Sequence, residues 1–201
     1  GGDSLALHWK RPRTKHPPLV VLADISGSMH RYTRMLLHFL HAVTHDHDRV
    51  ETFLFGTQLT RISRELKHRD IDQAINKVTQ KAADWAGGTR IGPCLREFNF
   101  RWARRVLGQN AVVLLISDGL DRDESGVLEG EMARLAGTCH RLIWLNPLLR
   151  YAGFEAKPAG VRAMLPYVDE FLPVHNLDSI AQLAEVFSTR NSRPSAWQRG
   201  L

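Results

Sequence analysis

Cysteine is scarce in this chain of 201 residues, and it has no long apolar run. Cys94 and Cys139 are its only cysteines, which is too few for a disulfide framework and favours a reducing compartment. No stretch reaches the roughly eighteen apolar residues of a membrane-spanning helix. The amino terminus lacks the apolar segment of a secretory signal, and Gly1-Gly2 resembles a remnant of cloning. We therefore expect a cytoplasmic protein.

Positive charge exceeds negative charge, with 27 lysine and arginine residues against 21 aspartate and glutamate residues and a formal charge of +6. This balance suits nucleic acid or an acidic protein partner. The basic residues are not interleaved with aromatic residues as in base-stacking proteins, so we do not expect nucleic-acid binding. Residues 1–16 form a basic, proline-containing arm. We interpret it as a solvated linker, or else as a strap that contacts an upstream domain or a partner.

A buried strand that ends in oxygen-bearing side chains organises the rest of the chain. Residues 19–23 are apolar without a polar break, which is typical of a strand buried on both faces of a parallel sheet. Asp24, Ser26 and Ser28 follow on alternate positions, and we expect Gly27 to allow a tight turn. Open α/β folds bind ligands at the carboxyl ends of such strands, and small oxygen ligands suit Mg²⁺.

Two later segments carry further oxygen donors. Thr89 lies in the glycine-rich stretch of residues 86–92, and Asp118 follows the apolar stretch of residues 111–116. A phosphate-binding P-loop would need a lysine after its last glycine, and this stretch has none. Its glycines are better explained by a close approach of the loop to a metal ion.

Asp24-x-Ser26-x-Ser28, Thr89 and Asp118, in this order, resemble the metal-ion-dependent adhesion site of von Willebrand factor type A (VWA) domains. The resemblance implies that the three hydroxyl groups bind the ion directly and that the two aspartates bind it directly or through water. It also implies an open coordination position for an acidic side chain of a partner. We expect the ion to be Mg²⁺, with Mn²⁺ or Ca²⁺ as alternatives. Partner contacts are expected from the neighbours of the ligands, namely Gly27, Met29, Gly88, Arg90 and Gly119.

The resemblance covers about residues 17–188. The alternation of strand and helix patterns predicts an α/β, doubly wound (Rossmann-like) fold, with a mainly parallel six-stranded sheet, one short antiparallel edge strand, and helices on both faces. Residues 189–201 are predicted to be a disordered tail. Strands are predicted at residues 19–23, 50–55, 58–62, 111–116, 140–145 and 167–174, and helices at residues 31–44, 70–85, 92–107, 125–136, 158–165 and 177–188.

The basic lead-in and the first metal loop are also similar to the CoxE-like branch of the VWA family. This similarity implies a bacterial accessory protein that works with a MoxR-type AAA+ ATPase in the maturation of a metalloenzyme, typified by carbon monoxide dehydrogenase. On this interpretation the domain is an adaptor, not an enzyme, and it holds the ATPase or the client through an acidic residue of that protein.

Two alternatives remain open. Asp24 could be the nucleophile of a haloacid-dehalogenase-like phosphotransfer enzyme. Such enzymes need a second aspartate two residues later as an acid–base group, and Ser26 occupies that position. The other alternative is a scaffold of the same fold that works without metal, against which the complete motif argues.

The helix predicted at residues 31–44 carries a polar face. His38, His41 and His45 are expected there together with Arg34. These side chains are either solvated or a weak site for zinc or nickel, because His41 and His45 are one helical turn apart.

The helix predicted at residues 92–107 is strongly basic on the side away from its apolar stripe. This side is either solvated or a docking face for an acidic partner. Its basic residues are Arg96, Arg101, Arg104 and Arg105.

Acidic residues follow the third metal loop, at Asp121, Asp123 and Glu124. One of them could be a metal ligand. The preferred interpretation is that they complement the dipole of the helix predicted at residues 125–136.

Overall fold

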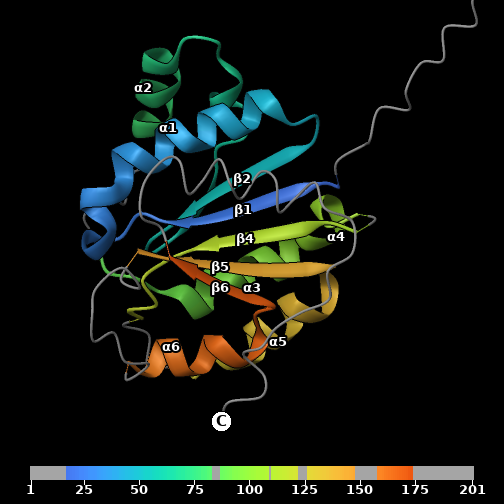
Figure 1. Cartoon of the computed structure of the whole chain (residues 1–201). Coiled ribbons are helices and arrows are strands. Elements are labelled where there is room, and N and C mark those ends of the chain that lie inside the picture. The colour runs from blue at the N-terminus through green and yellow to red at the C-terminus, as the bar shows by residue number, and fades with distance from the viewer. Residues whose placement is uncertain (1–16, 83–86, 109, 122–125, 148–157, 174–201) are drawn as a thin grey trace, which may run out of the picture.

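A six-stranded sheet in the order β3-β2-β1-β4-β5-β6 forms the centre of the computed structural model (Figure 1). The structure describes residues 17–82, 87–108, 110–121, 126–147 and 158–173. The strands are β1 (Leu19–Asp24), β2 (Val50–Phe55), β3 (Leu59–Arg61), β4 (Val112–Ile116), β5 (Arg141–Asn146) and β6 (Glu170–Pro173). Neighbouring strands are parallel except for β2 and β3, which are antiparallel. The predicted sheet is therefore confirmed.

Helices cover both faces of the sheet, as predicted (Figure 1). One face is covered by α1 (His30–Asp46) and α2 (Ile71–Lys81). The other is covered by α3 (Ile91–Arg101), α4 (Ala103–Val106), α5 (Leu128–Thr138) and α6 (Ala159–Met164). Short 3-10 helices are η1 (Gly27–Met29), η2 (Glu65–Lys67) and η4 (Leu165–Tyr167). Among the described residues, none of the helices has the length and apolar character needed to cross a membrane.

The apolar run of β1 supplies both halves of the hydrophobic core. Val21 and Ala23 pack into the cluster on the α1 side, while Val20 and Leu22 pack into the cluster on the α3 side. Each of these four side chains is fully buried. Because successive strand residues point to opposite faces, a strand between two helical layers must be apolar at every position.

Some predicted boundaries differ from those in the structure. The helix predicted at residues 92–107 is interrupted at Trp102 (φ −115°, ψ −35°), which separates α3 from α4. The Trp102 ring packs edge-on against Phe53 of β2 with ring centroids 5.3 Å apart, so tertiary packing overrides the helical pattern there. The closing helix predicted at residues 177–188, the tail and the arm lie outside the described residues.

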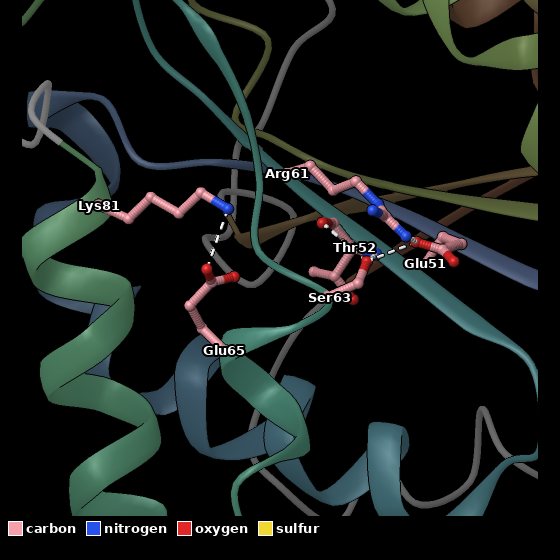
Figure 2. A network of polar contacts seen from close by, with 6 residues as sticks. All are labelled: Glu51, Thr52, Arg61, Ser63, Glu65 and Lys81. Carbon is pink, nitrogen blue, oxygen red and sulfur yellow. Dashed lines mark hydrogen bonds and ion pairs between the residues drawn. The ribbon is translucent and has the colours of Figure 1, made fainter.

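Side chains fasten the short edge strand β3 to its neighbours (Figure 2). Glu51 Oε2 accepts hydrogen bonds from Arg61 Nε (2.9 Å) and from the Ser63 hydroxyl (2.6 Å). The Ser63 hydroxyl in turn accepts the Thr52 N–H at 2.8 Å. These bonds continue the pairing of β2 with the chain beyond the end of a three-residue strand. In the same region, Lys81 of α2 pairs with Glu65 of η2 at 3.0 Å.

Two glycines in helices are expected to respond oppositely to alanine. At Gly92 in α3 a Cβ atom would lie 2.8 Å from Val127 Cγ2 and 3.1 Å from Leu128 N, whereas at Gly130 in α5 it would meet nothing within 4 Å. Gly92→Ala should lower the free energy of unfolding by ~1–3 kcal/mol through overpacking. Gly130→Ala should raise it by ~0.5–1 kcal/mol because alanine loses less backbone entropy on folding. Urea denaturation measures both, and equal stabilities would contradict the close α3–α5 packing.

Candidate metal centre

Three loops meet at the point where the strand order of the sheet reverses. β2 and β3 lie on one side of the β1–β4 pair, and β5 and β6 lie on the other. This switch point is where open α/β sheets bind ligands. A pocket of about 210 Å³ opens there. It is lined by Ser26, Gly27 and Ser28 of the first loop, Gly87, Gly88 and Thr89 of the second, and Leu120 of the third.

Asp24, at the end of β1, is fully buried and held on both oxygens. Its Oδ1 accepts the Ser26 N–H at 2.8 Å, and its Oδ2 accepts the Ser117 hydroxyl at 2.8 Å. Burial is the main cause that raises the pKa of Asp24 from 3.8 to about 6; the negative charge of Asp118 adds to the rise, and the hydrogen bonds oppose it. The free energy of unfolding of the metal-free protein should therefore fall as pH rises from about 4 to 6.

The serine hydroxyls of the first loop lie close together. Ser26 is buried and Ser28 is exposed, and their Oγ atoms are 3.2 Å apart. Neighbouring ligands of an octahedral ion with bonds of 2.0–2.1 Å are about 3 Å apart. The two hydroxyl oxygens therefore have about the spacing that a small divalent cation requires of neighbouring ligands.

The second loop brings Thr89 to the same pocket. Thr89 is buried, and the backbone on either side of it is fixed by hydrogen bonds. The Gly27 N–H donates to the Gly87 carbonyl at 3.4 Å, and the Arg90 N–H donates to the Gly56 carbonyl at 2.9 Å. The first bond joins the first and second loops, and the second bond holds the second loop at the end of β2.

Asp118 completes the set from the third loop and is also buried. Its Oδ1 accepts the Leu120 N–H at 3.0 Å, and its carbonyl accepts from Asn146 Nδ2 at 3.3 Å. The charge of Asp118 raises the pKa of Asp24. A divalent cation between these loops would relieve that repulsion.

The donor set suits a hard cation. It consists of three neutral hydroxyl groups and two carboxylates, and oxygen ligands of this kind are preferred by Mg²⁺, Mn²⁺ and Ca²⁺. Within the described part of the chain, no group of three or more His, Cys, Asp or Glu side chains could hold a metal ion. A pocket of about 210 Å³ has room for an ion and water, since one water occupies about 30 Å³ in the liquid.

Ser117 supports the candidate site, and the sequence analysis did not single it out. Its hydroxyl donates to Asp24 and accepts the Gly119 N–H at 3.0 Å, so one atom joins the first and third loops. The Ser117 carbonyl accepts from the buried Trp144 Nε1 at 2.9 Å. Its position next to Asp118 in the sequence could have drawn attention to it. Its hydrogen bond to Asp24 of β1, however, depends on the register of β4 against β1, which the sequence does not show.

Asp121 lies beside the site in a role other than the predicted one. Its Oδ1 accepts the Ile91 N–H at 3.0 Å, at the first residue of α3. It therefore complements the dipole of α3, not that of the helix that follows it in sequence. The bond also ties the third loop to the end of the second.

The predicted partner-contact residues are not equally accessible. Gly27 and Arg90 are exposed and Gly88 is half-buried, whereas Met29 is fully buried in the core. Gly27 was expected in a tight turn, and it opens the 3-10 turn η1, in which the Met29 N–H donates to the Ser26 carbonyl at 2.9 Å. A Cβ there would meet nothing within 4 Å, so space does not require a glycine at this position.

Gly119, the fifth predicted contact, is buried against α6. It has φ +74°, a conformation that favours glycine. A Cβ at Gly160 of α6 would lie 2.2 Å from the Gly119 carbonyl oxygen. The backbone of α6 therefore supports the third loop directly, and only a glycine fits at position 160 without a shift.

The histidines of α1 do not form a free metal-binding face. His41 Nε2 lies 2.8 Å from the His68 carbonyl, and His45 Nε2 lies 3.1 Å from the Leu66 carbonyl. These nitrogens thus contact the backbone around η2, and the hydrogen bonds fasten η2 to α1.

The sheet, its switch point and the oxygen donors define a VWA domain with a site of the metal-ion-dependent adhesion type. More narrowly, the chain belongs to the family described as VWA domain containing CoxE-like protein, whose model matches residues 1–180. No curated protein matches the chain.

Similar solved structures are VWA-type folds of low sequence identity. A von Willebrand factor type A protein from Catenulispora acidiphila is 18% identical with a TM-score of 0.58, and the match covers 87% of this chain and 41% of that one. The manganese-loaded TRAP protein of Plasmodium vivax is 20% identical with a TM-score of 0.58, and the match covers 89% and 75% of the two chains.

Another similar structure is proximal thread matrix protein 1 from the mussel byssus, with a zinc-occupied metal-ion-dependent adhesion site motif. It is 13% identical with a TM-score of 0.57, and the match covers 86% of this chain and 47% of that one. This chain thus spans less than half the length of the mussel and Catenulispora proteins. At these identities the likeness shows the fold.

Asp24→Asn should make the metal-free domain more stable and at the same time remove its stabilisation by Mg²⁺. Without metal at pH 7.5, the variant should unfold with a free energy ~1–3 kcal/mol higher, because a buried charge is removed. Mg²⁺ should stabilise the wild type against thermal unfolding and not the variant. Asp48→Asn, at an exposed position, is the matched control. A variant that Mg²⁺ stabilises as much as wild type would contradict the role of Asp24.

Ser117→Ala should weaken Mg²⁺ binding about 10- to 100-fold in calorimetric titration, because Asp24 and the third loop lose the hydroxyl that orients both. Ser63→Ala is the matched control: it removes another buried hydroxyl, at the β3 edge. It should lower stability without changing metal affinity. Equal loss of affinity in both variants would mean that the effect of Ser117 is one of general destabilisation.

Proposed function

We propose that this domain is a metal-dependent adaptor that binds an acidic side chain of a protein partner through a divalent cation, with Mg²⁺ as the preferred ion and Asp24, Ser26, Ser28, Thr89 and Asp118 as its ligands. The observation that carries the proposal is that three loops meet at one open pocket lined by Ser26, Ser28 and Thr89. The buried carboxylates of Asp24 and Asp118 lie next to it, because they accept the N–H groups of the lining residues Ser26 and Leu120. The manganese and zinc in two solved structures of the same fold support a divalent cation.

The chemistry of the ligands favours a carboxylate as the group that is captured. Three of the five proposed ligands are neutral hydroxyls, so a bound dication would keep an attraction for an incoming anion. The exposed Ser28 and Gly27 at the pocket, together with the exposed Arg90 next to Thr89, leave room for a partner's side chain. Partner contacts are thus proposed at Gly27, Gly88 and Arg90, and not at the buried Met29 and Gly119.

Membership of the CoxE-like family supports the identity of the partner that we propose. On this basis the partner is a MoxR-type AAA+ ATPase, a metalloenzyme client similar to carbon monoxide dehydrogenase, or both. The domain would then act in the cytoplasm as a maturation factor that connects the ATPase with its client.

Phosphotransfer catalysis by Asp24 is disfavoured by the surroundings of its carboxylate. The side chain is fully buried, and both oxygens already accept hydrogen bonds from Ser26 and Ser117. A nucleophile must reach a substrate phosphorus atom along an open approach. The remaining alternative, a metal-independent scaffold, is decided by experiment.

Asp24→Ala should abolish binding of the ATPase or client, and Thr89→Ala should weaken it, because each removes a ligand of the bridging ion. Biolayer interferometry with and without a chelator measures both, with circular dichroism as the check of folding. Thr79→Ala, which removes an exposed hydroxyl on α2, is the matched control for Thr89→Ala. Partner binding that survives both Asp24→Ala and the chelator would establish a metal-independent scaffold. If the domain binds Mg²⁺ but neither the ATPase nor the client, the proposed metal site is supported and the proposed partners are contradicted.

A further inference from the structure

An exposed phenylalanine lies beneath arginine side chains on the face covered by α3 and α5. Phe100 of α3 is 63% exposed, and Leu120 is the other large apolar side chain exposed among the described residues. The guanidinium carbon of Arg96 lies 5.8 Å from the centroid of the Phe100 ring, and that of Arg134 lies 5.3 Å from it. Arg96 precedes Phe100 by one turn of α3, whereas Arg134 comes from α5. These three residues are called the Phe100 surface below.

The stacked arginines are prepared to bind carboxylates. Contact with the aromatic ring partly fixes the orientation of a guanidinium group before a ligand arrives. Its N–H donors lie in the plane of the group and point away from its centre. Arg134 makes a weak pair with Glu131, whose Oε2 lies 3.8 Å from Arg134 Nε. The same oxygen accepts a 2.8 Å hydrogen bond from Asn99 and belongs to a buried residue.

Positive charge continues along the chain beyond the Phe100 surface. Arg101, Arg104 and Arg105 follow it in α3 and α4, and all three are exposed. Glu97 pairs with Arg101 at 3.1 Å. Arginines thus outnumber acidic residues on this part of the chain. A surface with an excess of positive charge attracts partners of negative charge and accelerates their encounter.

An apolar aromatic centre surrounded by arginines is the composition typical of the energetically dominant part of protein interfaces. We propose that the Phe100 surface binds an acidic segment of a protein partner, whose carboxylates pair with Arg96 and Arg134 and whose apolar side chain covers the exposed part of Phe100. Nucleic acid is a poorer fit, because base stacking needs an open aromatic face and the guanidinium groups lie over this ring.

The Phe100 surface is separate from the metal centre. Thr89 lies just before α3, whereas Phe100 lies near the other end of that helix. At 1.5 Å per residue, Phe100 is about 14 Å along the axis from Ile91. The proposed contact therefore needs no metal ion, and it goes beyond the metal-dependent capture proposed above.

The test uses a short fluorescein-labelled peptide of alternating glutamate and leucine, with the glutamine–leucine peptide as its neutral counterpart. Fluorescence anisotropy is measured in a chelator. We expect the acidic peptide to bind wild type and Asp24→Ala equally, and to bind Phe100→Ala and the Arg96→Glu, Arg134→Glu double variant at least about tenfold more weakly. Binding should also weaken as salt is added. Arg34→Glu, at an exposed position on α1 across the sheet, is the matched charge control for the single variant Arg134→Glu and should lose much less affinity than that variant.

Three results would overturn the proposal. The first is equal binding of the acidic peptide by wild type, Phe100→Ala and the double variant. The second is tighter binding of oligothymidylate than of the acidic peptide, which would assign the surface to nucleic acid. The third is a wild-type dimer in sedimentation that Phe100→Ala dissociates, because the occupant would then be a second copy of the chain. None of these results bears on metal binding by Asp24, so the two proposals fail independently.

Discussion

The parallel pairing of β1 with β4 is the constraint on which the metal centre depends. Ala23 pairs with Ile116 in this ladder, so the next residues, Asp24 and Ser117, lie side by side at the edge of the sheet. Their 2.8 Å hydrogen bond joins two segments that are far apart in sequence. A slip of one residue would exchange the two faces of β4 and remove both the hydroxyl and the following Asp118 from their places. The register that buries the core thus also assembles the site.

The site is maintained at a cost to stability. A carboxylate that is fully buried and near a second carboxylate destabilises the folded state, and the raised pKa of Asp24 expresses that cost. The hydrogen bonds from Ser26 and Ser117 offset part of it. The close contact between Gly160 and the Gly119 carbonyl is a second constraint near the site, because it leaves no room for a side chain at position 160. Such departures from ordinary core chemistry are expected where a site serves binding.

The sheet could be predicted from the sequence, as could the position of the proposed ligands at one edge of it, because both rest on local patterns. Uninterrupted apolar runs indicate buried strands, and residues that follow such runs, such as Asp24 and Asp118, lie at one edge of the sheet. Ser117 and Asp121 could not be assigned in this way, because their partners belong to other elements. Met29 was expected at the surface, yet η1 directs its side chain into the core. These differences arise from packing between elements, which periodicity does not record.

Helix α3 connects the two proposed recognition surfaces. It begins beside Thr89, is fixed there by the Asp121 side chain, and carries Phe100 near its far end. Gly92 lets α3 approach the start of α5, which also supplies Arg134. The spacing between the two surfaces is therefore set by a rigid helix and not by a loop. A partner that used both would need an acidic side chain for the metal ion and an acidic segment that reaches the far end of α3. Binding of the first would raise the effective concentration of the second. With two recognition surfaces, a domain with a small metal pocket could distinguish one acidic partner from the many acidic residues that other proteins expose.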